Sequence, residues 1–303
     1  MKIWKSLNSR AVSVAIGALV LFLSSLVQAQ IEVVDDLGNS VRLEKPATRI
    51  VSLAPHITES LYAIGAGENI VGTVRYSDFP LEASEIPIIG SFDEVSYESL
   101  LTLNPDLVIV WASGNGSEIT SRIKSLGLTV FLDEPRDIED VPSSLRRFGL
   151  LTGNEIVAAR EADSFISKLN SLRDAYSDSS VVDVFYQVWN DPITTLNGEH
   201  LISDIIQLCG GRNVFAETVP IAPVVSIESV LTADPQVIVA SGLADERPEW
   251  LDDWKDWSGL RASDTKQLYS ISADLLQRNA PRVIQGAELM CEALAQARTV
   301  YSH

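Results

Sequence analysis

The chain has 303 residues, of which 46% are hydrophobic and 21% charged, proportions that exclude wholesale disorder, collagen and coiled coil. Its length suggests two folding units of roughly 150 residues each. Acidic residues outnumber basic ones by 41 to 23 and give a formal net charge of -18. Because this negative charge repels the phosphate backbone of nucleic acids, we expect no nucleic-acid partner.

The first 29 residues have the pattern of a secretory signal peptide. Lys2, Lys5 and Arg10 precede a mostly apolar stretch over 11–26, and Val27-Gln28-Ala29 supplies the small residues of a cleavage site. An uncleaved membrane anchor is the alternative, but the apolar stretch is shorter than the roughly 20 residues that span a bilayer. No cysteine stands at the cleavage site, so we expect a soluble periplasmic protein without a lipid anchor.

Along the first half of the chain, β-branched and apolar runs alternate with amphipathic stretches that end at a glycine. The runs predict strands, the first pair as a hairpin, at 31–43, 49–53, 70–74, 107–111 and 129–132. The amphipathic stretches predict helices at 58–64 and 119–126. Residues 112–116, which follow Trp111, are expected to form a flexible loop. Strands alternating with short helices indicate a parallel α/β organisation.

Apolar residues recur at helical spacing from Asn154 to Ala175, with Gly153 just before them and a Ser/Asp cluster after them. This pattern predicts one helix of about 22 residues, roughly 33 Å long at about 1.5 Å per residue. Strand and helix patterns then alternate again, and they predict strands at 181–188 and 236–240 and helices at 201–208 and 281–298. The long helix therefore stands between two similar halves.

A ten-residue segment occurs twice, at a spacing of 130 residues. Residues 96–105 (SYESLLTLNP) return as 226–235 (SIESVLTADP) with six identical positions, and each copy leads into a strand. In each copy a serine caps a short helix, and a glutamate lies in the first turn, where the helix dipole favours a carboxylate. A common helix-to-strand building block used twice is the alternative. Six identities on either side of one long helix favour a duplicated lobe.

Cys209 and Cys291 are the two cysteines of the sequence, and both lie in the part that would be exported. An even pair in an oxidising compartment favours one disulfide, with two buried thiols as the alternative. Two cysteines without a nearby histidine do not make a convincing zinc site, and three histidines in all argue against a zinc or manganese receptor. We expect no metal site.

Catalytic motifs are largely missing, since the sequence has no G-x-S-x-G elbow, phosphate loop, H-E-x-x-H motif or G-x-G-x-x-G turn after a strand. A Ser-His-Asp triad would need His56 or His200, and nothing in their spacing recommends either. We therefore expect no enzyme and no catalytic cofactor. His56 stands at a strand-to-helix turn, where a local role at the helix entry competes with a ligand contact.

Aromatic residues near strand ends and in loops point to a binding pocket instead. These residues are Tyr76, Phe92, Trp111 and Trp189. Rings at such places can wall a pocket for a large planar ligand, although each ring alone fits core packing equally well. Trp250, Trp254 and Trp257 recur along a predicted helix, and core packing is the better interpretation for them.

Motifs in consecutive order resemble the periplasmic cobalamin-binding proteins of BtuF type, which serve ABC transporters and have a helical backbone. The motifs are RIVSLAPHITE, Val71-Gly72 to Tyr76-Ser77-Asp78-Phe79-Pro80, LNPDLVIVWASGN, ISDIIQLCGGRNVF and QRNAPR, within residues 49–298. The resemblance implies a class III periplasmic binding protein, an α/β fold with two Rossmann-like lobes, a single long backbone helix and a ligand cleft between the lobes. The implied divisions are a signal peptide at 1–29, an N-terminal lobe at 30–152, the linking helix at 153–177 and a C-terminal lobe at 178–303.

The resemblance also implies a function: a monomer that captures cobalamin or a related corrinoid and delivers it to an inner-membrane ABC permease. Matched residue by residue, the family's cobalamin contacts and aromatic walls fall on Tyr76, Phe92, Trp111, Asp274, Leu275, Leu276, Gln277 and Arg278. The family's two permease-docking glutamates match Glu98 and Glu228, the pair that the repeat had already singled out. For that pair, a purely local role at the helix start is the alternative.

The sequence departs from the family's best-known member at a few ligand positions. Ala222 and Thr194 stand where that member has aromatic residues, and so do Leu275 and Leu276. Trp189 is expected to compensate from a neighbouring position. A siderophore- or haem-binding protein of the same fold is the alternative function, with Tyr76 or His56 available as an iron ligand.

Overall fold

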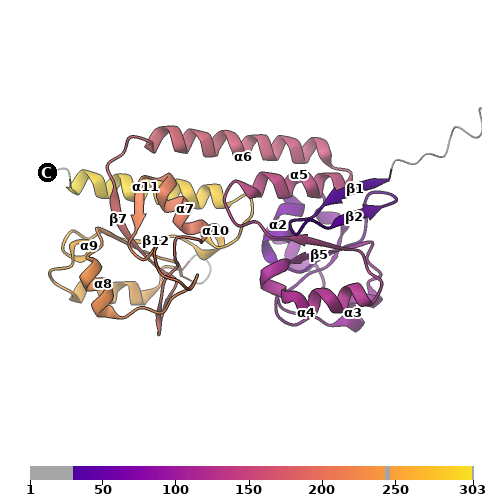
Figure 1. Cartoon of the computed structure of the whole chain (residues 1–303), viewed down its shortest axis with the longest axis horizontal. Coiled ribbons are helices and arrows are strands. Elements are labelled where there is room, and N and C mark those ends of the chain that lie inside the picture. The colour runs from indigo at the N-terminus through magenta and orange to yellow at the C-terminus, as the bar shows by residue number, and fades with distance from the viewer. Residues whose placement is uncertain (1–29, 243–245, 302–303) are drawn as a thin grey trace, which may run out of the picture.

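The computed structural model describes residues 30–242 and 246–301, so the predicted signal peptide lies outside the described residues. Two parallel four-stranded sheets, each covered by helices, stand side by side. The helix α6 (Glu155–Tyr176) runs along one side of the molecule past both of them, as Figure 1 shows. The predicted α/β fold with two lobes and a single long linking helix is confirmed.

The first lobe is built on a sheet with the strand order β4-β3-β5-β6, in which all neighbours are parallel. Its strands are β3 (Ile50–Ser52), β4 (Ile70–Gly72), β5 (Leu107–Trp111) and β6 (Val130–Asp133). Its helices are α2 (Pro55–Ala63), α3 (Tyr97–Thr102), α4 (Ala112–Ser125) and α5 (Asp140–Thr152), with 3-10 turns at Gly67–Asn69 and Leu81–Glu85. The predicted hairpin is present as β1 (Ile31–Val34) and β2 (Ser40–Leu43).

The second lobe has the strand order β10-β7-β11-β12, again with parallel neighbours. Its strands are β7 (Val182–Gln187), β10 (Gly211–Asn213), β11 (Val237–Ala240) and β12 (Leu268–Ser270), with a small hairpin of β8 (Trp189–Asn190) and β9 (Ile193–Thr194). Its helices are α7 (Leu201–Leu208), α8 (Ile227–Ala233), α9 (Arg261–Asp264), α10 (Ala273–Leu276) and α11 (Val283–Tyr301), with a 3-10 helix at Glu249–Asp256.

The two lobes repeat one topology. In each sheet the first strand is flanked by the second on one side and by the third and fourth on the other. The repeated segment forms α3 before β5 and α8 before β11, and the hydroxyls of Ser96 and Ser226 accept the equivalent backbone N–H of each helix. The matched topology and matched caps confirm the predicted duplication.

The helix α6 packs on both hydrophobic cores. Ala158 and Ala162 belong to the core of the first lobe, whereas Phe165 and Leu169 belong to the core of the second. Gly153, with a φ of 75°, ends α5 in the left-handed conformation that glycine adopts without strain, and the chain then turns into α6.

Two residues that precede α6 pack in the core of the second lobe. Ile138 and Val141 are 2% and 1% exposed and join the same cluster as Ile205 and Leu294. The second core therefore contains side chains that come from the first half of the chain. The predicted lobe boundaries at 152 and 178 stay a prediction.

The predicted disulfide is present. Cys209 and Cys291 are bonded, with their Cα atoms 4.6 Å apart, and both are fully buried. The bond ties the end of α7 to the final helix α11.

The structure corrects two expectations and adds helices that were not predicted, of which α5 is the longest. Residues 112–116 form the start of α4 instead of a loop, and Gly116, with a φ of 79°, marks a kink inside that helix. Trp254 packs in the core as expected, but Trp257 is 38% exposed, so the packing prediction is wrong for it. The helix α5 was not predicted, because Pro142 and Gly149 interrupt its apolar pattern.

Candidate functional site

A cavity of about 240 Å³ lies between the two lobes, beside the carboxyl ends of β3 and β5. This is the place where open α/β sheets bind ligands. Residues of both lobes line it, and among them are five of the predicted ligand contacts: Tyr76, Phe92, Trp111, Gln277 and Arg278. A cavity is therefore present where the cleft was predicted, and five of the nine predicted ligand contacts line it.

Trp111 and His56 form one wall of the cavity. The two rings meet edge to face, with centroids 5.5 Å apart and an interplanar angle of 89°. His56 is 6% exposed, and its Nε2 lies 3.3 Å from Oδ2 of Asp133 at the end of β6. Ser144 donates to the other oxygen of that carboxylate at 2.7 Å. His56 thus lines the cavity and contacts the indole, and both roles considered for it, at the helix entry and as a ligand contact, stay predictions.

Asn115 holds two aromatic walls in place. Its Oδ1 accepts the backbone N–H of Trp111 at 2.7 Å, and its Nδ2 donates to the carbonyls of Phe92 at 2.6 Å and Leu53 at 3.0 Å. The side chain is 5% exposed. Sequence reasoning missed Asn115, although its place one helical turn after a strand-ending tryptophan was a usable signal.

Tyr76 stands at the mouth of the cavity in a strained backbone conformation. Its φ is 67°, within a turn that the Ser77 N–H closes by donating to the Val74 carbonyl at 3.3 Å. Such a conformation costs a residue other than glycine about 1–3 kcal/mol and is concentrated at functional positions. Tyr76 is 74% exposed, although it lines the cavity.

The segment that follows α10 belongs to the second lobe but contacts the first. Arg278 forms ion pairs with Asp274 at 2.8 Å and with Asp78 of the first lobe at 2.9 Å. Its side chain is only 12% exposed, within the wall of the cavity. Asp274 therefore acts on the cavity through Arg278, since it lies beside the guanidinium.

The other predicted contacts have different surroundings. Trp189 lines a neighbouring cavity of about 630 Å³ that shares Gln277 with the first cavity. Leu275 is half-buried and lines neither of these two cavities. Leu276 is fully buried in the core of the second lobe, so the predicted ligand contact is wrong for it, because its side chain packs among apolar residues away from the cleft.

His200 also lines the cavity between the lobes, where no sequence pattern had placed it. It caps α7, since its Nδ1 accepts the backbone N–H of Ile202 at 3.2 Å. Burial lowers the pKa of His200 to about 4, so the imidazole is neutral at neutral pH. This part of the wall is therefore polar but uncharged.

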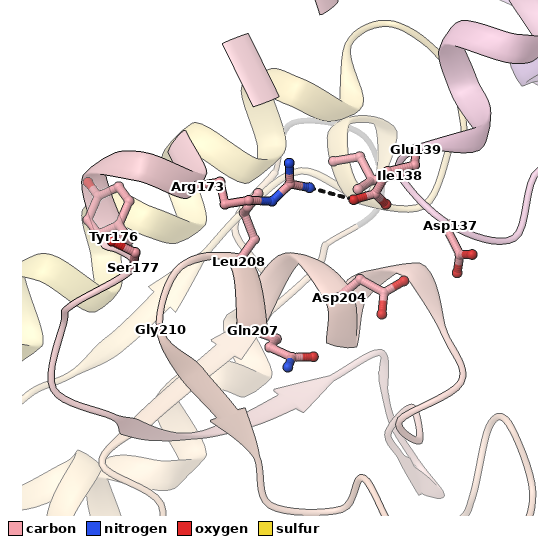
Figure 2. Close-up of a pocket in the computed structure, with 10 residues that line it drawn as sticks. All are labelled: Asp137, Ile138, Glu139, Arg173, Tyr176, Ser177, Asp204, Gln207, Leu208 and Gly210. Atoms are coloured by element: carbon pink, nitrogen blue, oxygen red, sulfur yellow. Dashed lines mark hydrogen bonds and ion pairs between the residues drawn. The ribbon is translucent and has the colours of Figure 1, made fainter. Parts of the chain in front are cut away.

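A separate cavity of about 490 Å³ lies between α6, α7 and the segment before α5, and Figure 2 shows its acidic side chains. Asp137, Glu139 and Asp204 line it, and Arg173 binds Glu139 at 2.6 Å. Burial, together with the neighbouring carboxylates Asp137 and Glu139, raises the pKa of Asp204 to about 6. The ligand contacts predicted above do not line this cavity.

Glu98 and Glu228 are exposed in the first turns of α3 and α8. Figure 1 shows both helices on the side of the molecule opposite α6, one on each lobe. Hydrogen bonds from its own backbone N–H and from the Ser226 hydroxyl lower the pKa of Glu228, so its carboxylate is charged at neutral pH. The two residues therefore share the side that their places in the repeat predicted.

Metal binding and membrane insertion were also considered for the described residues. Within 30–242 and 246–301, no group of three or more His, Cys, Asp or Glu side chains is placed to hold a metal ion. In this same part of the chain, the helices are too short or too polar for a membrane crossing.

Residues 50–275 match the family model described as periplasmic binding protein. The vitamin B12-binding protein of Vibrio cholerae serotype O1 is 35% identical over 254 residues, which are 84% of this chain and 91% of that relative. The vitamin B12-binding protein of Yersinia pestis is 31% identical over 253 residues, 84% of this chain and 88% of that relative.

Solved structures with a similar fold include periplasmic binding proteins. The crystal structure of the periplasmic vitamin B12 binding protein BtuF of Vibrio cholerae superposes with a TM-score of 0.77 at 34% identity, over 84% of this chain and 98% of that one. The periplasmic heme-binding protein RhuT from Roseiflexus sp. RS-1 superposes with a TM-score of 0.74 over 83% of this chain and 99% of that one. At 24% identity, this second likeness concerns the fold alone.

Proposed function

The chain belongs to the periplasmic binding protein family, and we propose that within it this protein captures cobalamin or a related corrinoid and delivers it to an ABC permease of the inner membrane. The observation that carries the proposal is the cavity between the lobes, where Tyr76, Phe92 and Trp111 meet the polar side chains of Gln277 and Arg278. Relatives named vitamin B12-binding proteins, at 31% identity or more over most of the chain, support it.

The chemistry of the wall suits a large planar ligand with a polar rim. Aromatic rings supply apolar area that a corrin face can cover, at about 25 cal/mol for each Å² buried. Gln277 and Arg278 can donate hydrogen bonds to the amide carbonyls around a corrin ring. A corrinoid is large, so we place part of it in the adjoining cavity, where Trp189 is the compensating aromatic wall.

The proposal is one of binding without catalysis. The two histidines of the cavity are held by structural contacts, His56 beside Asp133 and His200 at the N–H of Ile202. Cobalamin is thus a bound ligand rather than a catalytic cofactor. We also propose that the protein works as a monomer in the periplasm after the first 29 residues are removed.

Delivery requires contact with the permease, for which we propose Glu98 and Glu228. Each carboxylate is exposed on an equivalent helix of its own lobe, on the side away from α6. Two like charges held at a fixed separation match a permease with two-fold symmetry. The rigid packing of α6 on both cores keeps that separation constant.

Titration with cyanocobalamin, followed by tryptophan fluorescence, tests the proposed ligand. We expect saturable quenching with one ligand per protein, because Trp111 lines the cavity and Trp189 the adjoining one. Haem is the ligand to compare, since the Tyr76 phenol and the His56 imidazole both lie at the cavity and could bind iron. If the protein shifted the Soret band of haem but did not respond to cyanocobalamin, the proposed ligand would be haem and not a corrinoid.

A further inference from the structure

The guanidinium of Arg278 lies between two carboxylates that come from opposite lobes. Asp274 is in the same lobe, one helical turn earlier, and pairs with it at 2.8 Å. Asp78 comes from the first lobe, 200 positions away in the chain, and pairs with it at 2.9 Å. This second ion pair spans the two lobes directly at the cavity, because Arg278 is part of the cavity wall.

Two further contacts tie the same segment to the first lobe, and both are better protected from water. Asn279 donates to the Pro135 carbonyl at 2.6 Å. Arg282 donates to both carboxylate oxygens of Glu59, at 2.9 and 2.7 Å, and Glu59 is 2% exposed. Removing one member of a buried ion pair of this kind is strongly destabilising, so the Glu59–Arg282 pair does not open readily.

The contact of Asp78 is different in kind. The Asp78 side chain is 55% exposed. Because one partner of this pair is exposed to water, salt screens the pair, and it opens at a smaller cost than the pair of Arg282 with the buried Glu59. When it opens, Asp274 still holds Arg278, and the guanidinium keeps its orientation while some of its donors become free.

Resting on the function proposed above, we propose that the Asp78–Arg278 ion pair is a latch across the cleft and that an entering ligand displaces Asp78 from Arg278. Asp78 then competes with the ligand for the guanidinium and determines specificity. A ligand whose rim carries hydrogen-bond acceptors, such as the amide carbonyls of a corrinoid, replaces the lost carboxylate. A ligand without acceptors leaves Arg278 unpaired on that side and is disfavoured.

The substitution Asp78→Asn tests the latch, because it removes the competing charge at constant size. We expect the variant to bind cyanocobalamin about two- to fivefold more tightly than the parent at low salt, the range of an exposed ion pair. The difference should vanish at about 0.5 M salt, where the parent's pair is already screened. Glu82→Gln is the matched control, since Glu82 is exposed in the 3-10 turn that follows Asp78 and forms no ion pair within the described residues.

A second measurement needs no ligand. In the ligand-free variant Asp78→Asn, we expect faster amide hydrogen exchange over residues 273–280 than in the parent and in Glu82→Gln. Binding that is unchanged or weaker in Asp78→Asn, or exchange that is unchanged, would overturn the latch. A parent protein that does not bind cyanocobalamin would overturn the proposed ligand instead, and the exchange measurement would still decide whether the latch exists.

Discussion

Gly114 packs against the face of the Trp111 ring so closely that a Cβ atom on Gly114 would lie 1.9 Å from a ring carbon. The first turn of α4 therefore fits against the indole because residue 114 has no side chain. The glycine therefore sets the position of the ring within the wall of the cavity that it lines.

The substitution Gly114→Ala should displace the Trp111 ring. Because the ring would leave the cavity wall, we expect cyanocobalamin binding to weaken by about 0.5–1.5 kcal/mol, the worth of an aromatic contact beyond its buried area. Isothermal titration measures the change. Ser113→Ala is the control, since Ser113 is exposed in the same turn and should bind like the parent. Equal affinities for Gly114→Ala and the parent would contradict this role of the glycine.

Two substitutions at Tyr76 separate ligand contact from backbone strain. Both Tyr76→Ala and Tyr76→Gly remove the ring, so we expect each to weaken cyanocobalamin binding by about 1–3 kcal/mol. They should differ in stability without ligand, because alanine is strained at a φ of 67° and glycine is not. We expect thermal unfolding to show Tyr76→Gly more stable than Tyr76→Ala by about 1 kcal/mol. A reversed order would contradict the strain at this residue.

The double variant Glu98→Ala/Glu228→Ala tests docking on the permease. Both residues are exposed, and their helices α3 and α8 lie on the side of the molecule away from α6, so cyanocobalamin affinity should stay at the parental value. Transporter-coupled uptake should fall sharply, because losing one partner of an interfacial charge pair costs about 2–5 kcal/mol when the pair is buried in the complex. Glu85→Ala/Glu217→Ala removes the same charge from exposed positions and serves as the control. If the variant Glu98→Ala/Glu228→Ala supported uptake at the parental level, both glutamates would have only a local role at the start of their helices.

The acidic cavity of Figure 2 makes stability depend on pH through Asp204. Folding raises its pKa from 3.8 to about 6, so the folded state disfavours the charged carboxylate. Below pH 3.8 the group is protonated in both states and has no effect, whereas above pH 6 the full penalty applies. Stability due to this group therefore falls as the pH rises through that window.

We expect Asp204→Asn to stabilise the protein at pH 7.5 by about 1 kcal/mol, a figure discounted because water screens a half-buried carboxyl. At a pH of about 3.5 the gain should disappear, since the carboxyl is then neutral as well. Thermal unfolding at the two pH values measures it. Asp174→Asn, at an exposed position of α6, should change stability at neither pH. A gain of the same size at both pH values would assign the effect to packing instead of charge.

Periodicity was sufficient to predict the long helix and the buried strands, because each of them is specified by apolar residues close together in the sequence. The start of α4 could not be predicted in this way. Its Ala-Ser-Gly-Asn-Gly composition favours a loop, and tertiary contacts of Asn115 and Gly114 with Trp111 override that local preference. Local composition alone contains no sign of those contacts.

The candidate site, too, was predictable from the sequence only in part. The resemblance placed Tyr76, Phe92 and Trp111 together, and the structure brings them to one cavity. Leu276 was misplaced because alignment gives a position in the chain but not the direction of a side chain, and this one faces the core. Asp78 could not be paired with Arg278 from sequence, since 200 positions separate them and no periodic pattern spans such a distance.

Ile138 and Val141 lie before the linking helix in the chain but fill the core beyond it. A gene cut at the linking helix α6 would therefore not yield two self-sufficient halves. The N-terminal fragment would carry two apolar side chains without a core to enter, and the C-terminal fragment would contain a hole where those side chains belong. We therefore expect the two lobes to melt together in a single calorimetric transition.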